Sequence, residues 1–207
     1  PASVAEAARL ASGANLPRIS PATLLTTRLP LPPIEEQRRI AAVLDTAQRT
    51  ADQADAVPDL TRAAIAAHLA NLASSIDAAA WPSQPLGEIV DPQRRITRGI
   101  DQPGPDIPDG VPYIKTTDFA RRRLRRELLA RSSTSIEQRF PRSRVRAGDL
   151  VMCIRATVGP VLRVTSDLAG ANLSRGTALI APGPDIDSRF LLATLEAPAF
   201  QARVRER

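Results

Sequence analysis

Apolar residues recur at helical spacing along a central stretch from about residue 33 to residue 80. Steps of four and three residues alternate, as in a heptad seam, and Pro58 interrupts the pattern before it resumes in a shifted frame. The seam positions are Ile40, Leu44, Ala47, Ala51, Ile65, Leu69, Leu72 and Ile76. The pattern predicts either one kinked helix or two consecutive helices.

A long helix with a single apolar stripe needs a second stripe to pack against, because helical propensity alone does not stabilise it in water. No other predicted helix of this chain has a similar length. We therefore expect the partner stripe on another chain, or on a part of the protein outside this sequence. His68 flanks the seam, where a partly buried structural histidine is expected.

Proline residues mark the start of the long helix. Pro30, Pro32 and Pro33 favour an extended lead-in, and Pro33 suits a first helical turn. Glu35 and Glu36 follow where the helix dipole favours negative charge. Upstream, we expect a helix over residues 1 to about 12 and a short turn of helix capped by Ser20.

Short apolar runs separated by Gly and Pro begin at Leu86 and predict strands. The runs are LGEIV, VPYIK, DLVMCIR, GPVLRV and TALIA. Asp187 can cap a helix over SRFLLATLEA, and Pro198 begins a last helical stretch. The expected class is α+β, with a long coiled-coil-type helix joined to a β-rich domain that carries a few helices.

The charge balance favours a polyanionic partner. The net charge is +6, the hydrophobic fraction is 43%, and Lys115 is the sole lysine. Arginine can pair two acceptors at once on phosphate or guanine, so nucleic acid is the first candidate. A GC-rich genome explains the arginine usage equally well.

Several classes of function are not supported. One cysteine, Cys153, and one histidine exclude a disulfide framework and a multi-histidine metal site. No phosphate-binding, metalloprotease or nucleophile-elbow motif occurs, and Asp149 and Asp167 are interpreted as solvated turn formers. No run approaches the ~18 apolar residues of a membrane helix. We expect a cytoplasmic protein without catalytic or metal-binding residues.

Arginine residues crowd the second half of the chain, whereas the long helix is close to charge-balanced. This asymmetry favours contact with DNA, and the alternative is a solvated basic face. The candidate DNA-binding residues are Arg95, Lys115, Thr116, Arg121, Arg122, Arg123, Arg144, Arg155, Thr157, Asn172 and Arg175. Arg155 and Arg175 lie at strand ends, where pairing with a local carboxylate is an equally good interpretation.

Several ordered blocks resemble the specificity (S) subunits of type I restriction-modification systems. LPLPPIEEQRRIAAVLD resembles the entry into their helical spacer, and GVPYIKTTDF, GDLVMCIRATVGPVLRV and AGANLSRGTALIAP resemble parts of a target recognition domain. The resemblance divides the chain into residues 1–32, the tail of one recognition domain, residues 33–80, a spacer, and residues 85–207, a second recognition domain that is incomplete at its C-terminus. In that family the spacers pair as a coiled coil, and each recognition domain reads half of a bipartite target.

The resemblance also implies partners. These are double-stranded DNA, a methyltransferase (M) subunit, a restriction (R) subunit, and the second half of the S subunit or a second copy. S-adenosylmethionine, ATP and Mg²⁺ would belong to the partner subunits. The chain is short for the family and begins at Pro1 without Met, so we expect a segment of a longer protein. A recognition segment of a fused methyltransferase-endonuclease and a structural coiled-coil adaptor are the alternatives.

Overall fold

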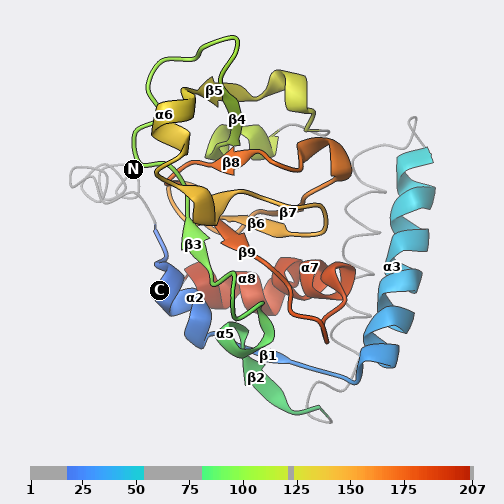
Figure 1. Cartoon of the computed structure of the whole chain (residues 1–207). Coiled ribbons are helices and arrows are strands. Elements are labelled where there is room, and N and C mark those ends of the chain that lie inside the picture. Colours follow the sequence, from blue (N-terminus) through green and yellow to red (C-terminus); the bar gives the residue numbers. More distant parts are fainter. Residues whose placement is uncertain (1–17, 54–80, 121–123, 206–207) are drawn as a thin grey trace, which may run out of the picture.

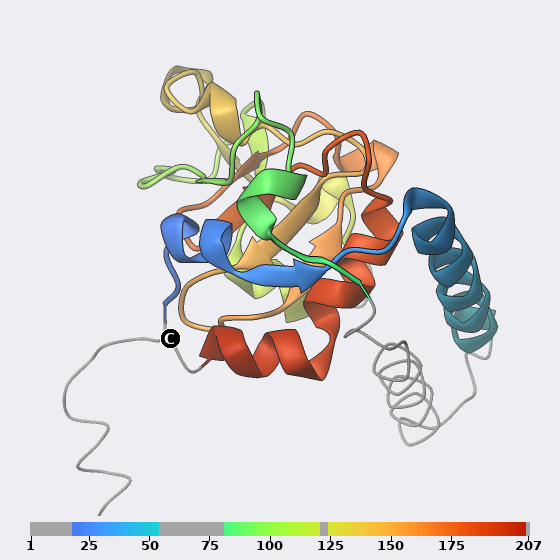
Figure 2. The ribbon, with the colours of Figure 1, turned by 90° about the horizontal axis from the view of Figure 1, so that it is seen from below.

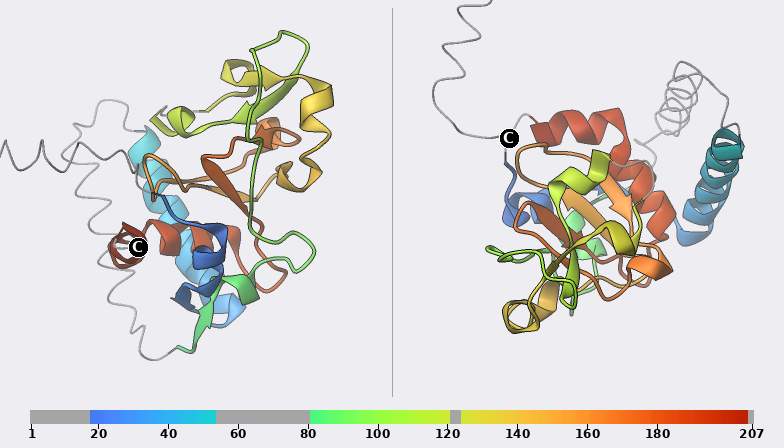
Figure 3. Two further views of the ribbon diagram at one scale, coloured as in Figure 1. Left: turned by 90° about the vertical axis from the view of Figure 1, so that its left-hand side faces the viewer. Right: turned by 90° about the horizontal axis from the view of Figure 1, so that it is seen from above.

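The computed structural model describes residues 18–53, 81–120 and 124–205 of the 207, with 47–53 and 205 described by their backbone only (Figure 1). Two sheets are stacked above a layer of helices, and a longer helix stands at one side. The side view in Figure 3 shows the same order of layers. Helices and antiparallel sheets occur together, so the predicted α+β class is confirmed.

The central sheet has four antiparallel strands in the order β3 (Thr97–Arg98), β9 (Thr177–Ile180), β6 (Leu150–Cys153) and β7 (Val161–Arg163). Every residue of β6 and β9 is buried, because both faces of this sheet are covered. Continuous apolar runs are typical of such strands, and the predictions of strands at these two positions and at β7 are confirmed.

A three-stranded sheet covers one face of the central sheet. Its order is β5 (Ala130–Ser132), β4 (Val111–Ile114) and β8 (Asn172–Leu173), with β4 antiparallel to β5 and parallel to β8. Alternate residues of the central strands, Val151 and Leu179, pack with Ile114 and Leu173 in the hydrophobic cluster between the sheets.

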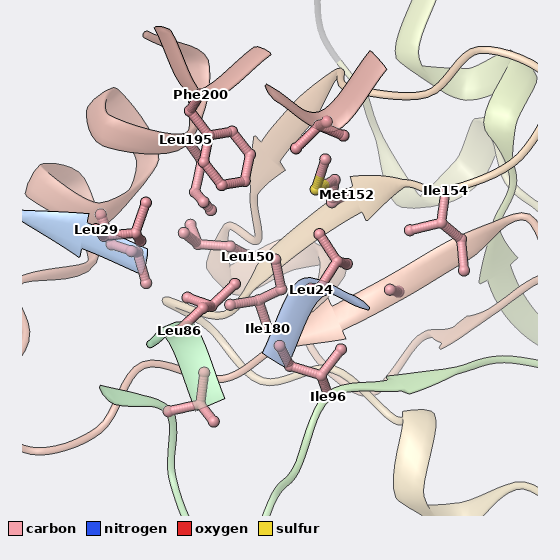
Figure 4. Packing of buried hydrophobic residues seen from close by; sticks show 14 of the residues in the cluster. Leu24, Leu29, Leu86, Ile96, Leu150, Met152, Ile154, Ile180, Leu195 and Phe200 are labelled. Atoms are coloured by element: carbon pink, nitrogen blue, oxygen red, sulfur yellow. The ribbon is translucent and has the colours of Figure 1, made fainter. Parts of the chain in front are cut away.

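Short helices cover the opposite face of the central sheet, as Figure 2 shows from below. They are α2 (Pro21–Thr26), α5 (Leu86–Ile89), α7 (Ser188–Glu196) and α8 (Pro198–Arg205). The largest hydrophobic cluster lies in this layer, where Leu150, Met152 and Ile180 pack with residues such as Leu24 and Phe200 (Figure 4). The predicted caps are confirmed: Ser20 accepts from the Thr23 N–H, and Asp187 accepts from two N–H groups of α7.

The segment before the long helix belongs to the same core as the segment after it. Strand β1 (Arg28–Pro30) pairs with β2 (Ser83–Pro85), and Ile19 donates its N–H to the carbonyl of Ile154 over 2.8 Å. Ile19, Leu24 and Leu29 are buried in the largest cluster. The predicted boundary separates residues 1–32 from residues 85–207, whereas the described part of the first range packs into the core of the second.

One predicted strand is wrong. The run LGEIV forms the helical turn α5, because Pro85 leads into it and Leu86 and Ile89, three residues apart, are buried on one side. The remaining short helices are η1 (Thr116–Ala120), η2 (Arg126–Leu128), α6 (Thr134–Glu137), η3 (Pro141–Ser143) and η4 (Ser166–Leu168).

The long helix α3 (Ile34–Gln53) is fixed to the body by its first turn. Gln37 is only 1% exposed; its amide donates to the carbonyl of Pro32 over 2.9 Å and accepts from the Asp187 N–H over 3.0 Å. Arg189 at the start of α7 pairs with both Asp45 and Asp187. These contacts hold α3 against α7.

The expectation that α3 finds its helical partner outside the chain is wrong for its first half, because α7 of the same chain lies against it. Ile40 and Leu44 are half-buried. The side chains of Ala47 and Ala51, and the predicted seam positions Ile65, Leu69, Leu72 and Ile76, lie outside the described residues. The coiled coil therefore stays a prediction. Among the described helices, none combines the length and the apolar character needed to cross a membrane.

Candidate nucleic-acid interface

Two adjoining hollows lie on one surface and share the residues Ile96 and Thr97 in their walls. The larger hollow has a volume of about 1000 Å³, and its arginines are Arg94, Arg95, Arg142, Arg144 and Arg146. The smaller hollow has a volume of about 670 Å³, and its arginines are Arg18, Arg98, Arg155 and Arg175. Among the described residues that line the two hollows, none is acidic.

Arg94 of the larger hollow is held by a buried carboxylate. Its two terminal nitrogens donate to the two carboxylate oxygens of Asp149, each over 2.7 Å, and the side chains are 15% and 4% exposed. Asp149 also accepts from the N–H of Arg146 over 2.6 Å. The interpretation of Asp149 as a solvated turn former is therefore wrong, because the turn folds its carboxylate inward onto Arg94.

Arg144 is held in the same way by Glu137, over 2.5 and 2.6 Å. The hydrogen bond from Arg144 keeps the pKa of the Glu137 carboxyl below its ordinary value, against the opposing effect of burial. Asn172 donates to Glu137 over 2.9 Å and accepts from Ser143 over 2.6 Å. Because Asn172 is fully buried in this network, its prediction as a DNA contact is wrong.

The arginines of the smaller hollow are positioned by their backbone. Arg18 and Arg155 face each other in an antiparallel β-bridge. Arg155 follows β6, and Ala156 next to it has a positive φ of 67°, so the chain turns sharply there. Arg175 donates its N–H to the carbonyl of Ile100 over 2.8 Å. Strand ends and loops from four parts of the chain, including the segment of Arg98, thus meet at this hollow.

The structure separates the predicted DNA-binding residues into groups. Arg95 and Arg144 line the larger hollow, and Arg155 and Arg175 line the smaller one. Lys115, Thr116 and Thr157 line neither. Arg121, Arg122 and Arg123 lie outside the described residues.

Sequence reasoning missed the contribution of the segment before α3. Arg18, Ser20 and Thr23 line the smaller hollow although they lie far from the arginine clusters in the sequence. Their only local signal is the helix cap at Ser20, which indicates a turn but not what the turn faces. The pairing of Arg18 with Arg155, 137 positions later, is not encoded locally.

The arginines of the two hollows offer hydrogen-bond donors and positive charge.

The single cysteine, Cys153, lies in neither hollow. Burial raises the pKa of the Cys153 thiol to about 12, so the thiol stays protonated at neutral pH. Within the described part of the chain, no group of three or more His, Cys, Asp or Glu side chains could hold a metal ion.

Comparisons with known proteins agree with the family resemblance in the sequence. A scan against protein-family models finds no match. The chain is 29% identical over 216 residues to the type I restriction enzyme EcoBI specificity subunit of Escherichia coli, covering 92% of this chain and 45% of the relative. It therefore spans about half the length of the curated relative that it matches.

Two solved structures also align with the chain at 24% identity. The HsdS subunit of Thermoanaerobacter tengcongensis aligns with a TM-score of 0.48 over 86% of this chain and 44% of that one. A chain in a structure of a type I restriction-modification system aligns with a TM-score of 0.45, over 83% and 43%. In sequence, over most of its length, this chain is similar to about half of a type I restriction enzyme specificity subunit.

Proposed function

We propose that the chain is a DNA-sequence-recognition module of a type I restriction-modification system, without catalysis of its own. The observation that carries this proposal is the surface with two hollows, where the lining residues that the structure describes include nine arginines (five and four) and no acidic residue. Similarity to a specificity subunit supports the same assignment.

The charge of this surface is only partly compensated, because six of its nine arginines have no carboxylate partner within the described residues. Arg94 and Arg144 are paired with Asp149 and Glu137, but both carboxylates are buried behind the surface. For the other arginines the structure shows one carboxylate contact within the described residues, an exposed pair of Arg98 with Asp101. Uncompensated guanidinium groups on one surface attract a polyanion and displace its counterions.

The module would read one half of a bipartite target in duplex DNA. Of the predicted residues we retain Arg95, Arg144, Arg155 and Arg175 as contacts, because they line the hollows. We propose that α3 and the helical region after it dock a methyltransferase subunit and a restriction subunit, together with a second copy or the other half of a specificity subunit. S-adenosylmethionine, ATP and Mg²⁺ would be bound by those subunits.

The DNA-binding proposal is tested by titrating a labelled duplex with the chain between 50 and 200 mM NaCl. The logarithm of the association constant should fall linearly with the logarithm of the salt concentration, with a slope of about −0.9 for each phosphate neutralised. Arg142→Ala should make this slope less steep by the contribution of about one phosphate. Arg38→Ala is the matched control, because Arg38 is an exposed arginine of α3 with a local partner, Glu35. Binding that is weak and independent of salt would contradict the proposal.

The docking proposal is tested separately by co-purification. Val43 on α3 is 54% exposed, so Val43→Asp should leave the fold intact and reduce recovery of the methyltransferase subunit. Ala120→Asp, at an exposed position on the opposite layer, is the control. Equal recovery with all three proteins would show that this face of α3 does not dock the subunit.

A further inference from the structure

The bridge between Arg18 and Arg155 places two like charges directly opposite each other. Residues opposite in an antiparallel pair have Cβ atoms roughly 4.5–5.5 Å apart, and like charges there reduce stability. Both side chains line the smaller hollow. Among the described residues, no carboxylate pairs with Arg18, Arg155 or Arg175. An arrangement that is unfavourable for the free protein is favourable once a ligand supplies acceptors.

The linings of the two hollows differ in chemistry. Five guanidinium groups dominate the larger hollow, which suits phosphate oxygens because these only accept hydrogen bonds. The smaller hollow has four guanidinium groups and, besides the shared Ile96 and Thr97, adds the hydroxyls of Ser20 and Thr23 and an apolar contact from Ile154. Base edges in the major groove present donors, acceptors and the thymine methyl group, so they require this kind of mixture.

We propose that the smaller hollow is the base-reading subsite, and that Arg18 is a specificity-determining residue in it together with Arg155. The larger hollow then anchors the sugar-phosphate backbone. This inference rests on the proposed DNA recognition and adds that a residue before the long helix reads the same half-site as the domain after it. A recognition unit confined to residues 85–207 would lack one wall of its reading surface.

The rigid placement of Arg18 supports this role. Next to Arg18, Ile19 is 4% exposed and bonded through its backbone to Ile154, and Leu24 in α2 is fully buried. The guanidinium group of Arg18 therefore starts from a fixed backbone, although its side chain is exposed. Fixed attachment favours a defined contact to one base over a diffuse contact to any phosphate.

The test is selection of preferred duplexes from a randomised pool by the full 207-residue chain and its variants. Arg18→Ala and Arg155→Ala should each lose discrimination at one base pair, the two at the same or adjacent positions, by roughly 5- to 150-fold. Arg142→Ala should weaken all sequences alike, and Arg38→Ala should change neither preference nor affinity. Arg18→Lys keeps the charge but loses the planar fork, so it should retain affinity and lose preference.

The outcomes separate this inference from the proposed function. An unaltered preference in Arg18→Ala, a uniform loss over all sequences, or full preference in Arg18→Lys would overturn the assignment of Arg18 while leaving DNA recognition intact. If the unmodified chain shows no sequence preference, the proposed function itself fails. Circular dichroism of each variant confirms that the fold is retained.

Discussion

The two hollows position their arginines by different means. In the larger hollow, Arg94 donates two hydrogen bonds to the buried carboxylate of Asp149, and Arg144 donates two to that of Glu137. In the smaller hollow, Arg18 and Arg155 have no such partner among the described residues and are placed by a backbone bridge. The segment that carries Arg18 is fixed by Leu24, which is buried in the largest hydrophobic cluster.

This difference indicates how much each arginine contributes to the stability of the fold. A guanidinium group held by a buried carboxylate is part of the structure, since removing either member leaves an unpaired charge. A guanidinium group held only through its backbone contributes little to stability and keeps its donors for a ligand. Mutation of Arg94 or Arg144 should therefore affect mainly stability, and mutation of Arg18 or Arg155 mainly recognition.

The largest effect is expected for Asp149→Ala. It leaves Arg94, 15% exposed, without its partner and removes the acceptor for the Arg146 N–H. Breaking a buried ion pair costs about 3–5 kcal/mol of the free energy of unfolding. Urea denaturation measures this, and Asp109→Ala, at an exposed loop position, is the control. A loss no greater than in the control would show that the pair does not hold the hollow together.

The apolar support of the smaller hollow is tested by Leu24→Ala. Leu24 is fully buried between α2 and the central sheet, so its truncation should lower the free energy of unfolding by about 3 kcal/mol. Thermal unfolding measures the loss. Leu128→Ala, at a position that is 50% exposed, should cost much less. Equal losses would mean that the segment before α3 is not part of the core in solution.

Glu137→Gln should lower the free energy of unfolding by about 2 kcal/mol, because the amide offers Arg144 one uncharged acceptor oxygen in place of two carboxylate oxygens. The folded-state pKa of Glu137 lies below its ordinary value of 4.5, so its stabilising effect is present above that pH and is lost as the pH falls through the folded-state pKa. The difference in stability between the two proteins should therefore shrink below about pH 4.5.

Denaturation of both proteins at a series of pH values checks this expectation. Glu127→Gln is the control, because Glu127 is 67% exposed and lies 3.9 Å from Arg125. A difference that is constant between pH 7 and pH 3 would contradict the assignment of the pKa shift to the pair with Arg144.

Local patterns in the sequence predicted several elements correctly, with LGEIV as an exception, but not how the elements meet. The apolar runs of β6 and β9 and the caps at Ser20 and Asp187 are local signals, and the structure confirms them. The placement of Asn172 in a buried network depends on contacts with Glu137 and Ser143, which come from distant turns.

The place of Arg18 in the lining of the smaller hollow could not be predicted for the same reason. Arg28 pairs with Pro85 across the whole helical region, and this pairing brings the segment before α3 to the central sheet. Charge clustering in the sequence pointed to the larger hollow, where Arg142, Arg144 and Arg146 are neighbours. It could not point to the smaller hollow, because the four arginines there come from four separate segments.

The smallest change in stability is expected for Arg98→Ala in the smaller hollow. Arg98 contacts Asp101 over 3.3 Å, but the side chains are 55% and 45% exposed, so the free energy of unfolding should change by less than about 0.5 kcal/mol. The salt dependence of DNA binding should nevertheless fall by about one phosphate, or the base preference should change. Urea denaturation and the duplex titration measure the two effects on the same variant. A loss of stability comparable to that of Asp149→Ala, with unchanged binding, would remove the contrast between the hollows, because an arginine of the smaller hollow would then also serve the fold.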